Sequence, residues 1–161
     1  MSNAVSAIPP GYHSLIPAIT CKNAAAAIDF YKKIFGATEI MRMEGPGGMV
    51  MHGELKIGDS VIFVADEFPG MSAAPSGDGP VSSYLFIYMD DVDNVFSRAV
   101  EEGCKVSMPL ADMFWGDRYG KLTDPFGHHW GLAQHVEDVS PDEMERRGKE
   151  WQASMAKAAG A

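Results

Sequence analysis

The sequence predicts an α+β protein made of two tandem βαβββ modules. In each half, a strand pattern is followed by a helical pattern and then by three more strand patterns. The glycines that end the two predicted helices, Gly36 and Gly103, lie 67 positions apart (103 − 36). The glycines of two predicted hairpins, Gly58 and Gly127, lie 69 apart (127 − 58). Two independent landmarks at nearly one offset indicate an internal duplication.

The first module is expected over residues 13–66, after an N-terminal arm of residues 1–12. Its first strand is predicted at 15–21, where β-branched residues alternate loosely with others. Asn23 fits the N-cap of a helix whose apolar residues recur at intervals of three and four, and Gly36 supplies its left-handed end. The other three strands are predicted at 38–43, 49–57 and 60–65.

Residues 67–81 are rich in Pro, Gly and Ser and predict a linker or a binding loop without regular structure. The second module is expected over residues 82–137. Its first strand is predicted at 82–89, and its helix begins at Asp90-Asp91 and ends at Gly103. The remaining strands are predicted at 106–108, 118–123 and 130–136.

Residues 138–161 predict a C-terminal helix and tail. The helix starts at the capping-box sequence Ser140-Pro-Asp-Glu, which has Pro at the first helical position. A narrow apolar stripe at helical spacing follows, formed by Met144, Gly148, Trp151 and Met155. Such a stripe predicts packing against the rest of the chain or against a second subunit.

The composition argues against several classes of partner. The net charge of −9, from 22 acidic and 13 basic side chains, repels phosphate backbones, so we expect no nucleic-acid partner. No apolar run approaches the roughly 20 residues that span a bilayer, and the N-terminus has no signal-peptide pattern. We therefore expect no membrane association. Cys21 and Cys104 are expected as buried free thiols in a reducing, cytoplasmic setting.

Four segments make the fold prediction more specific, namely residues 27–37, 90–93, 114–120 and 124–128. Together they resemble the signatures of the vicinal oxygen chelate superfamily (glyoxalase, bleomycin-resistance and extradiol-dioxygenase relatives), and most of all its PhnB-like branch. The resemblance implies that the modules form a curved mixed sheet around a central cavity. It also implies that metal-dependent members hold a divalent cation there, through His, Glu or Gln of the first and last strands of each module.

The corresponding positions of this sequence carry no metal ligands. They fall at Ile16, Tyr84 and Gly131, and residues 61–65 contain no carboxylate, imidazole or amide. Hydrocarbon, phenol and hydrogen cannot replace such ligands around a divalent ion. We therefore expect no metal cofactor. The alternative is a divalent metal ion at displaced ligands, for which the candidates are His52, Glu54 and His129.

Strand alternation predicts which side chains line the cavity. In residues 82–89, Tyr84, Phe86 and Tyr88 share the cavity face, and the residues between them face the helices. Three aromatic rings form a slot for a flat or apolar ligand. Alternatively, the rings only fill the space that a metal ion and its substrate would otherwise take.

Further ligand-binding candidates follow the second module's helix. Phe114 and Trp115 precede Arg118, and an aromatic pair beside a guanidinium fits an anionic aromatic compound. The alternative is that Arg118 pairs with Asp117 or Asp124. Two more candidates lie in the last strand, where Gly131 would widen the cavity beside His129.

The predicted function is a glyoxalase/bleomycin-resistance-like protein that binds an aromatic or amphipathic small molecule in the cavity, without a metal, as a homodimer. One alternative is a divalent-metal-dependent lyase, isomerase or dioxygenase of the same superfamily. Another is a structural or regulatory protein whose cavity is closed by its own side chains. No catalytic residue is assigned, because the chain has no nucleophile motif or dinucleotide fingerprint. Metal-free catalysis would need an acid or base among Tyr84, Tyr88, His129 and Glu54.

Overall fold

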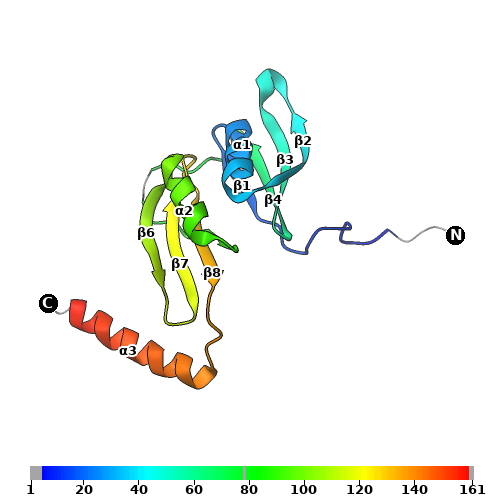
Figure 1. Ribbon diagram of the computed structural model, residues 1–161. Coiled ribbons are helices and arrows are strands. Elements are labelled where there is room, and N and C mark those ends of the chain that lie inside the picture. The colour runs from blue at the N-terminus through cyan, green and yellow to red at the C-terminus, as the bar shows by residue number, and fades with distance from the viewer. Residues whose placement is uncertain (1–4, 78, 160–161) are drawn as a thin grey trace. The chain divides into compact units, whose positions relative to one another are not determined.

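The computed structural model describes residues 5–77 and 79–159, and the chain divides into two compact units, Met1–Gly79 and Pro80–Ala161 (Figure 1). Each unit contains one four-stranded mixed sheet and one helix that follows the sheet's first strand. A further helix lies at the C-terminal end. The predicted α+β fold of tandem βαβββ modules is confirmed. The central cavity of the two modules stays a prediction.

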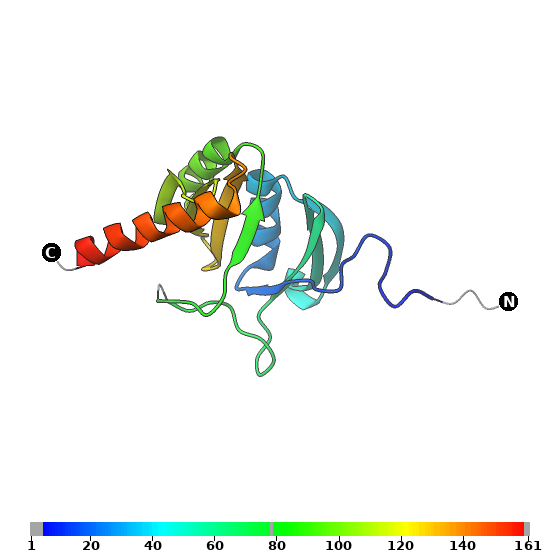
Figure 2. The same cartoon turned by 90° about the horizontal axis from the view of Figure 1, so that it is seen from below.

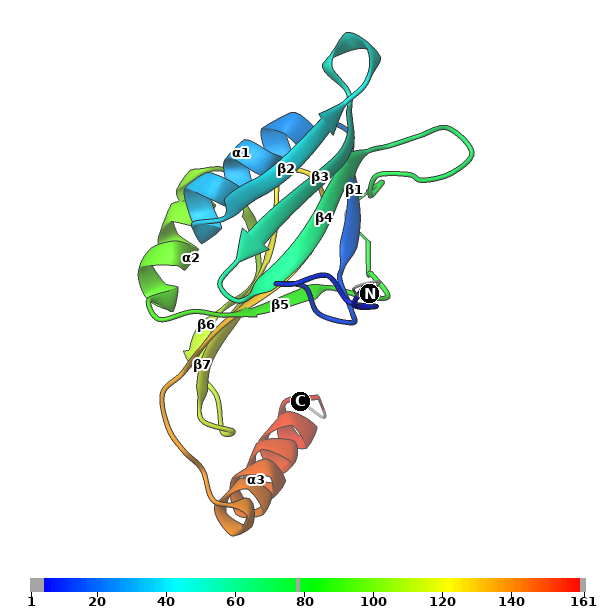
Figure 3. The ribbon, with the colours of Figure 1, turned by 90° about the vertical axis from the view of Figure 1, so that its right-hand side faces the viewer.

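The first unit has the strand order β1-β4-β3-β2, with β1 parallel to β4 and the other neighbours antiparallel (Figure 3). Its elements are β1 (Ala18–Cys21), α1 (Ala24–Phe35), β2 (Thr38–Glu44), the 3₁₀ turn η1 (Pro46–Gly48), β3 (Val50–Ile57) and β4 (Ser60–Asp66). Strand β1 begins three residues later than the predicted start at residue 15. Pro17 precedes it, and a proline has no N–H to donate to a ladder.

The second unit repeats this topology, with the strand order β5-β8-β7-β6 and β5 parallel to β8. Its elements are β5 (Leu85–Tyr88), α2 (Val92–Glu101), β6 (Lys105–Asp112), β7 (Asp117–Thr123), β8 (His129–His135) and α3 (Pro141–Ala159). Strand β6 is longer than the predicted 106–108 because it continues past Pro109. The pairing with β7 shifts between Met108 and Ala111, and an edge strand tolerates a proline at such an irregularity.

The strand registers match residue by residue between the units. In the first unit, one row across the sheet consists of Ala18, Phe63, Glu54 and Met41. In the second unit, the same row consists of Phe86, Gly131, Lys121 and Met108. Equivalent residues lie 67 or 68 positions apart (121 − 54 and 131 − 63). A register shift directly precedes Met41 and Met108 in both units, which supports the duplication.

Each core lies between the sheet and its helix. In the first unit it includes Ile28, Tyr31 and Ile34 of α1, which are buried. Gly53 lets α1 approach the sheet, because an added Cβ would lie 3.0 Å from Ile28 Cδ1. Gly120, 67 positions later (120 − 53), does the same for α2, since its Cβ would lie 2.8 Å from Phe96 Cε2. We call the sheet face opposite α1 or α2 the open face of that unit.

The predicted ends of α1 and the predicted start of α3 are confirmed, whereas α2 ends with its C-cap at Glu102, one residue before the predicted Gly103. The Asn23 side chain accepts a hydrogen bond from the Ala26 N–H at 3.0 Å, and Gly36 ends α1 with a φ of 64°. Ser140 Oγ accepts from the Glu143 N–H at 3.4 Å at the start of α3. Both cysteines are buried and free, as predicted, and burial raises the pKa of the Cys104 thiol to about 12.

Helix α3, orange to red in Figure 2, follows β8 at the C-terminal end, and part of the predicted stripe lies against Phe114 of its own unit. The Trp151 ring lies 5.7 Å from the Phe114 ring, and Gly148 faces the same ring. Trp151 and Met155 nevertheless remain 47% and 53% exposed. Across residues 5–77 and 79–159, no helix is long and apolar enough to cross a membrane.

Candidate ligand-binding site

The open face of the second unit gathers most of the predicted ligand-binding residues. Alternation along β5, β7 and β8 separates these side chains from those that face α2. The open-face set includes Tyr84, Phe86, Tyr88, Asp117, Tyr119, Lys121, His129, Gly131 and His135. Apart from Tyr84, which directly precedes β5, these residues lie on the three strands, so the backbone ladder fixes their spacing.

Aromatic rings form a continuous cluster on this face. Phe86 stacks on Tyr119 at 5.3 Å between ring centroids and also contacts Tyr88 at 5.0 Å. Trp115 extends the cluster from the loop before β7, 5.9 Å from Tyr119. Despite these contacts, Tyr84, Phe86 and Tyr88 are 46%, 44% and 60% exposed. The cluster therefore presents an aromatic surface supported by buried rings.

Gly131 makes room for this cluster. A Cβ at Gly131 would lie 3.0 Å from Tyr119 Cε2 and 3.1 Å from atoms of Phe86 and Tyr84. The sequence predicted that this glycine would widen the cavity beside His129. Instead, the space over Gly131 is filled by the chain's own aromatic rings.

Asp117 organises the edge of the aromatic cluster. Its carboxylate is 3% exposed and accepts hydrogen bonds from Tyr88 Oη at 2.8 Å, Trp115 Nε1 at 2.9 Å and a ring nitrogen of His135 at 2.9 Å. Burial alone would raise the pKa of Asp117, but the bonds from His135, Tyr88 and Trp115 outweigh it and lower the pKa. The ionised carboxylate thus fixes two aromatic side chains of the cluster.

His135 is a residue that sequence reasoning did not select. Its second ring nitrogen lies 2.9 Å from Asp138, and Asp138 and Asp117 together raise the pKa of His135. Period-two alternation could have found this side chain, because it places His135, Ala133 and Gly131 on one face of β8. What alternation alone does not reveal is the pairing of Asp117 with His135 across β7 and β8.

Lys121 provides a positive charge on the same face. Its Nζ lies 4.4 Å from the centroid of the Tyr84 ring, within the range of a cation–π contact. Tyr84 is in turn hydrogen-bonded to Tyr119, and burial followed by this bond raises the pKa of Tyr119. Lys121 is not among the ligand-binding residues predicted from the sequence, because nothing along β7 distinguishes it from a solvated lysine.

The structure does not bring Arg118 together with the aromatic residues. Arg118 points to the α2 side, where its guanidinium binds both carboxylate oxygens of Asp93, at 2.6 and 2.7 Å, and Asp112 at 3.1 Å. Neither partner considered from the sequence, Asp117 or Asp124, is the one used. The arginine links α2 to the sheet and lies apart from Phe114 and Trp115, whose rings contact each other at 5.1 Å.

On the open face of the first unit, His52 and Glu54 lie side by side as alternation predicted. His52 Nε2 is 2.9 Å from Glu54, and Tyr12 of the N-terminal arm also donates to this carboxylate. Glu54 is only 8% exposed, and the hydrogen bonds from Tyr12 and then His52 lower its pKa. The His52 ring contacts Phe63 at 4.7 Å. The arm thus engages the Glu54 carboxylate, and the His52 side chain stays 35% exposed.

The side chains at the expected metal-ligand positions do not fit the metal centre of the superfamily. By strand register, Phe63 is the equivalent of Gly131, and Ile16 and Tyr84 stand two residues before the paired Ala18 and Phe86. None of these side chains is a metal ligand of the expected kind. His52 and Glu54 have no third metal-ligating residue beside them, because no group of three His, Cys, Asp or Glu within residues 5–77 and 79–159 could hold a metal ion.

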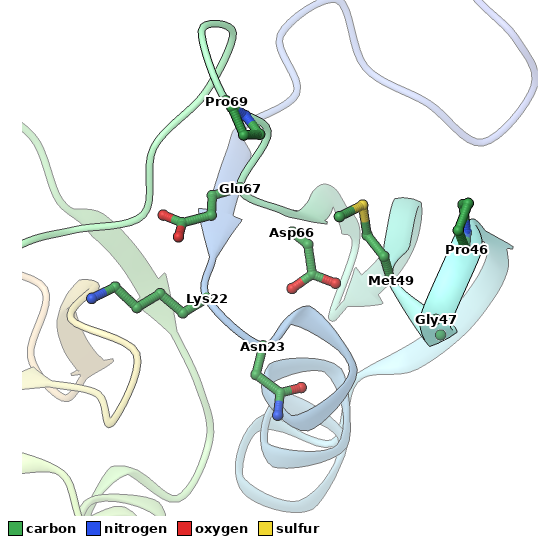
Figure 4. Close-up of a pocket in the computed structure, with 9 residues that line it drawn as sticks. Lys22, Asn23, Pro46, Gly47, Met49, Asp66, Glu67 and Pro69 are labelled. Carbon is green, nitrogen blue, oxygen red and sulfur yellow. The ribbon is translucent and has the colours of Figure 1, made fainter.

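A separate hollow of about 580 Å³ lies at the start of α1 (Figure 4). It is lined by Lys22, Asn23, Pro46, Gly47, Gly48, Met49, Asp66, Glu67 and Pro69. The Asp66 carboxylate in its wall accepts from the Ala24 and Val50 N–H groups, each at 2.7 Å. Both oxygens therefore hold the backbone in place, and none of the predicted ligand-binding residues lines this hollow.

Comparison with known proteins identifies relatives of the chain. The model of the Glyoxalase/Bleomycin resistance protein/Dioxygenase superfamily matches residues 14–132. The uncharacterized protein Mb0911c of Mycobacterium bovis is 40% identical over 136 residues, which cover 82% of this chain and 90% of that protein.

Two solved structures show the same fold. TioX from Micromonospora sp. ML1 is 23% identical with a TM-score of 0.62, over 77% of this chain and 99% of that one. The PhnB protein from Bacillus cereus is 17% identical with a TM-score of 0.60, over 76% of this chain and 99% of that one. The resemblance to the vicinal oxygen chelate superfamily is thereby confirmed, and the two structures share its fold.

Proposed function

Because this chain belongs to the Glyoxalase/Bleomycin resistance protein/Dioxygenase superfamily, we propose that it binds a flat aromatic or amphipathic small molecule, without a metal ion, on the open face of its second unit. The observation that carries this proposal is the row of exposed aromatic side chains along β5, formed by Tyr84, Phe86 and Tyr88. Contiguous exposed apolar surface on a protein commonly marks a binding site.

The fold itself does not require aromatic residues at these positions. Strand register equates Phe86 with Ala18 and Tyr88 with Thr20 of the first unit, in the same sheet topology. A small and a polar residue therefore suffice to build the strand. The aromatic rings of β5 add exposed apolar surface beyond what the sheet needs, and this supports a role in binding.

The rings are also held in place before any ligand arrives. Tyr88 is fixed by its hydrogen bond to Asp117, and Phe86 by stacking on the buried Tyr119. Rigid aromatic side chains lose little conformational entropy on binding, so more of the contact energy remains as affinity. Stacking of a flat ligand on such rings adds about 0.5–1.5 kcal/mol per ring pair beyond area burial.

Metal independence rests on the residues at the expected ligand positions. His52 and Glu54, the best remaining candidates for metal ligands, are hydrogen-bonded to each other, and Tyr12 also donates to the Glu54 carboxylate. Native mass spectrometry after addition of Ni²⁺, Zn²⁺ or Mn²⁺ tests this part. We expect no stoichiometric ion, whereas one ion per chain that is lost in Glu54→Gln would favour the metal-dependent lyase, isomerase or dioxygenase.

The same spectra test the assembly. Trp151 and Met155 leave apolar surface exposed on α3, which supports a homodimer. The two buried free thiols, Cys21 and Cys104, support a reducing, cytoplasmic location. We expect native spectra to give twice the mass of one chain. The mass of a single chain at every protein concentration would contradict the dimer.

The binding proposal is tested with a thermal-shift screen of aromatic compounds against the wild type and the Phe86→Ala variant. Alanine is chosen because the first unit has Ala18 at the equivalent position. A ligand at 100 times its dissociation constant stabilises the protein by about 2.7 kcal/mol. We expect this shift in the wild type and its loss in Phe86→Ala. Lys149→Gln, which removes an exposed lysine of α3 paired with Glu145, is the control and should retain it. An equal shift in Phe86→Ala, or no shift with any compound, would contradict the proposal.

A further inference from the structure

Lys121 lies over the aromatic surface with no carboxylate beside it. Its Nζ is 4.4 Å from the Tyr84 ring centroid. In residues 5–77 and 79–159 it forms no ion pair within 4.0 Å, whereas Arg118, Arg146, Arg147 and Lys149 of the same unit all do.

Among the open-face residues of β5, β7 and β8, the carboxylate is that of Asp117, and both of its oxygens are already hydrogen-bonded within the unit. Tyr88 and Trp115 donate to its Oδ2, and His135 lies against its Oδ1. The residue is also only 3% exposed. An aromatic surface with a free carboxylate would favour a cationic ligand. Here the carboxylate is used internally and the accessible charge is positive.

The fold does not require a cation at position 121. The equivalent position of the first unit holds Glu54, since both residues pair with the same site of the last strand, Phe63 in one unit and Gly131 in the other. Glu54 is matched by donors from Tyr12 and His52. Lys121 instead faces an aromatic ring and lacks such a partner for its charge.

We propose that Lys121 makes the open face of the second unit select aromatic anions over neutral aromatic compounds. The inference rests on the proposed function. The flat part of the ligand stacks on Phe86 and Tyr88, and its carboxylate, sulfonate or phosphonate accepts a charge-assisted hydrogen bond from the Lys121 ammonium. No existing ion pair has to break for this contact to form.

A matched pair of probes tests the selection. 2-Naphthoate and 2-naphthamide share the same rings and differ in charge. Their dissociation constants are measured by titration calorimetry at pH 8 on the wild type, Lys121→Gln, Lys121→Arg and Lys149→Gln. The last variant removes a lysine of α3 that is paired with Glu145. Melting temperatures of all four proteins check that each is folded.

We expect the wild type to bind 2-naphthoate about tenfold more tightly than 2-naphthamide, the size of one charge-assisted hydrogen bond. Lys121→Gln should abolish this preference because it weakens the binding of 2-naphthoate and leaves that of 2-naphthamide unchanged. Lys121→Arg keeps the positive charge and should keep the preference, as should Lys149→Gln. Raised salt should reduce the preference.

The contrary outcomes are separable. Equal affinity of the wild type for both probes would overturn the selection by Lys121 and leave the proposed aromatic binding intact. Loss of both probes in a folded Lys121→Gln variant would assign the lysine a structural role and would also overturn the selection. Binding of neither probe to the wild type would count against the proposed function itself, and the inference would fall with it.

Discussion

Glu54 and Lys121 occupy the same position in the two copies of the sheet, one acidic and one basic. Each lies at the centre of an equivalent row, with Met41 or Met108 on one side and Phe63 or Gly131 on the other. The helix-facing positions have kept their character, as Gly53 and Gly120 both admit a helix. The duplicated units therefore differ in charge at this open-face position while the helix-facing glycine beside it is kept.

Replacing Gly131 by alanine is expected to destabilise the protein. The new Cβ would lie 3.0–3.1 Å from atoms of three aromatic rings that other contacts hold in place. Overpacking of this kind costs about 1–3 kcal/mol. Urea unfolding of Gly131→Ala and of Gly79→Ala, whose added Cβ would meet nothing within 4 Å, measures the difference. A neutral effect at Gly131 would mean that the rings move apart easily.

Replacing Asp117 by asparagine should cost about 2 kcal/mol of stability. Tyr88 and Trp115 donate to one carboxylate oxygen, and His135 lies against the other. An amide has a single oxygen, so its NH₂ group would face either Tyr88 and Trp115 or His135. The negative charge that strengthens the remaining hydrogen bonds would also be lost. The free energy of unfolding is compared with that of Asp138→Asn, whose side chain is fully exposed. Similar small losses in both variants would show that the buried network contributes little.

His135 should titrate above its ordinary pKa of 6.5, because Asp138 and then Asp117 stabilise the imidazolium. A raised folded-state pKa means that the stabilisation is fully present below about pH 6.5, and it is lost as the pH rises through the folded-state value. NMR titration of the His135 ring measures this. Asp138→Asn should lower the pKa, whereas Asp142→Asn, on α3, should not. An unchanged pKa in Asp138→Asn would contradict the assignment.

Replacing Gly148 by alanine should stabilise the protein. This glycine lies inside α3, where alanine is favoured by about 0.8–1.0 kcal/mol. The added Cβ would come within 3.5 Å of the Phe114 ring, an ordinary van der Waals contact. Thermal unfolding checks the gain. Gly116→Ala is the opposite case, since its φ is 95° and its Cβ would fall 2.1 Å from the Glu137 carbonyl oxygen, so a large loss is expected. A lower melting temperature of Gly148→Ala would mean that α3 must tilt away from Phe114.

The architecture of the two units could be predicted from the amino-acid sequence alone. Helical periodicity, capping residues and paired glycines predict local structure, and local structure depends on neighbouring residues along the chain. The duplication, the order of strands and helices, the Asn23 and Gly36 caps and the aromatic face of β5 were therefore all predictable. Alternation also placed His52 beside Glu54, because residues two apart on a strand share a face.

The charged side chains that lie at the candidate site became clear from the tertiary structure. The partners of Arg118 are Asp93 on α2 and Asp112 on β6, and the partner of Asp117 is His135 on the adjacent strand. Such contacts depend on strand register and on which face a helix covers, which no local pattern encodes. For the same physical reason, the lysine Lys121 lies on the aromatic face, whereas Arg118, three residues after Trp115 in the sequence, does not.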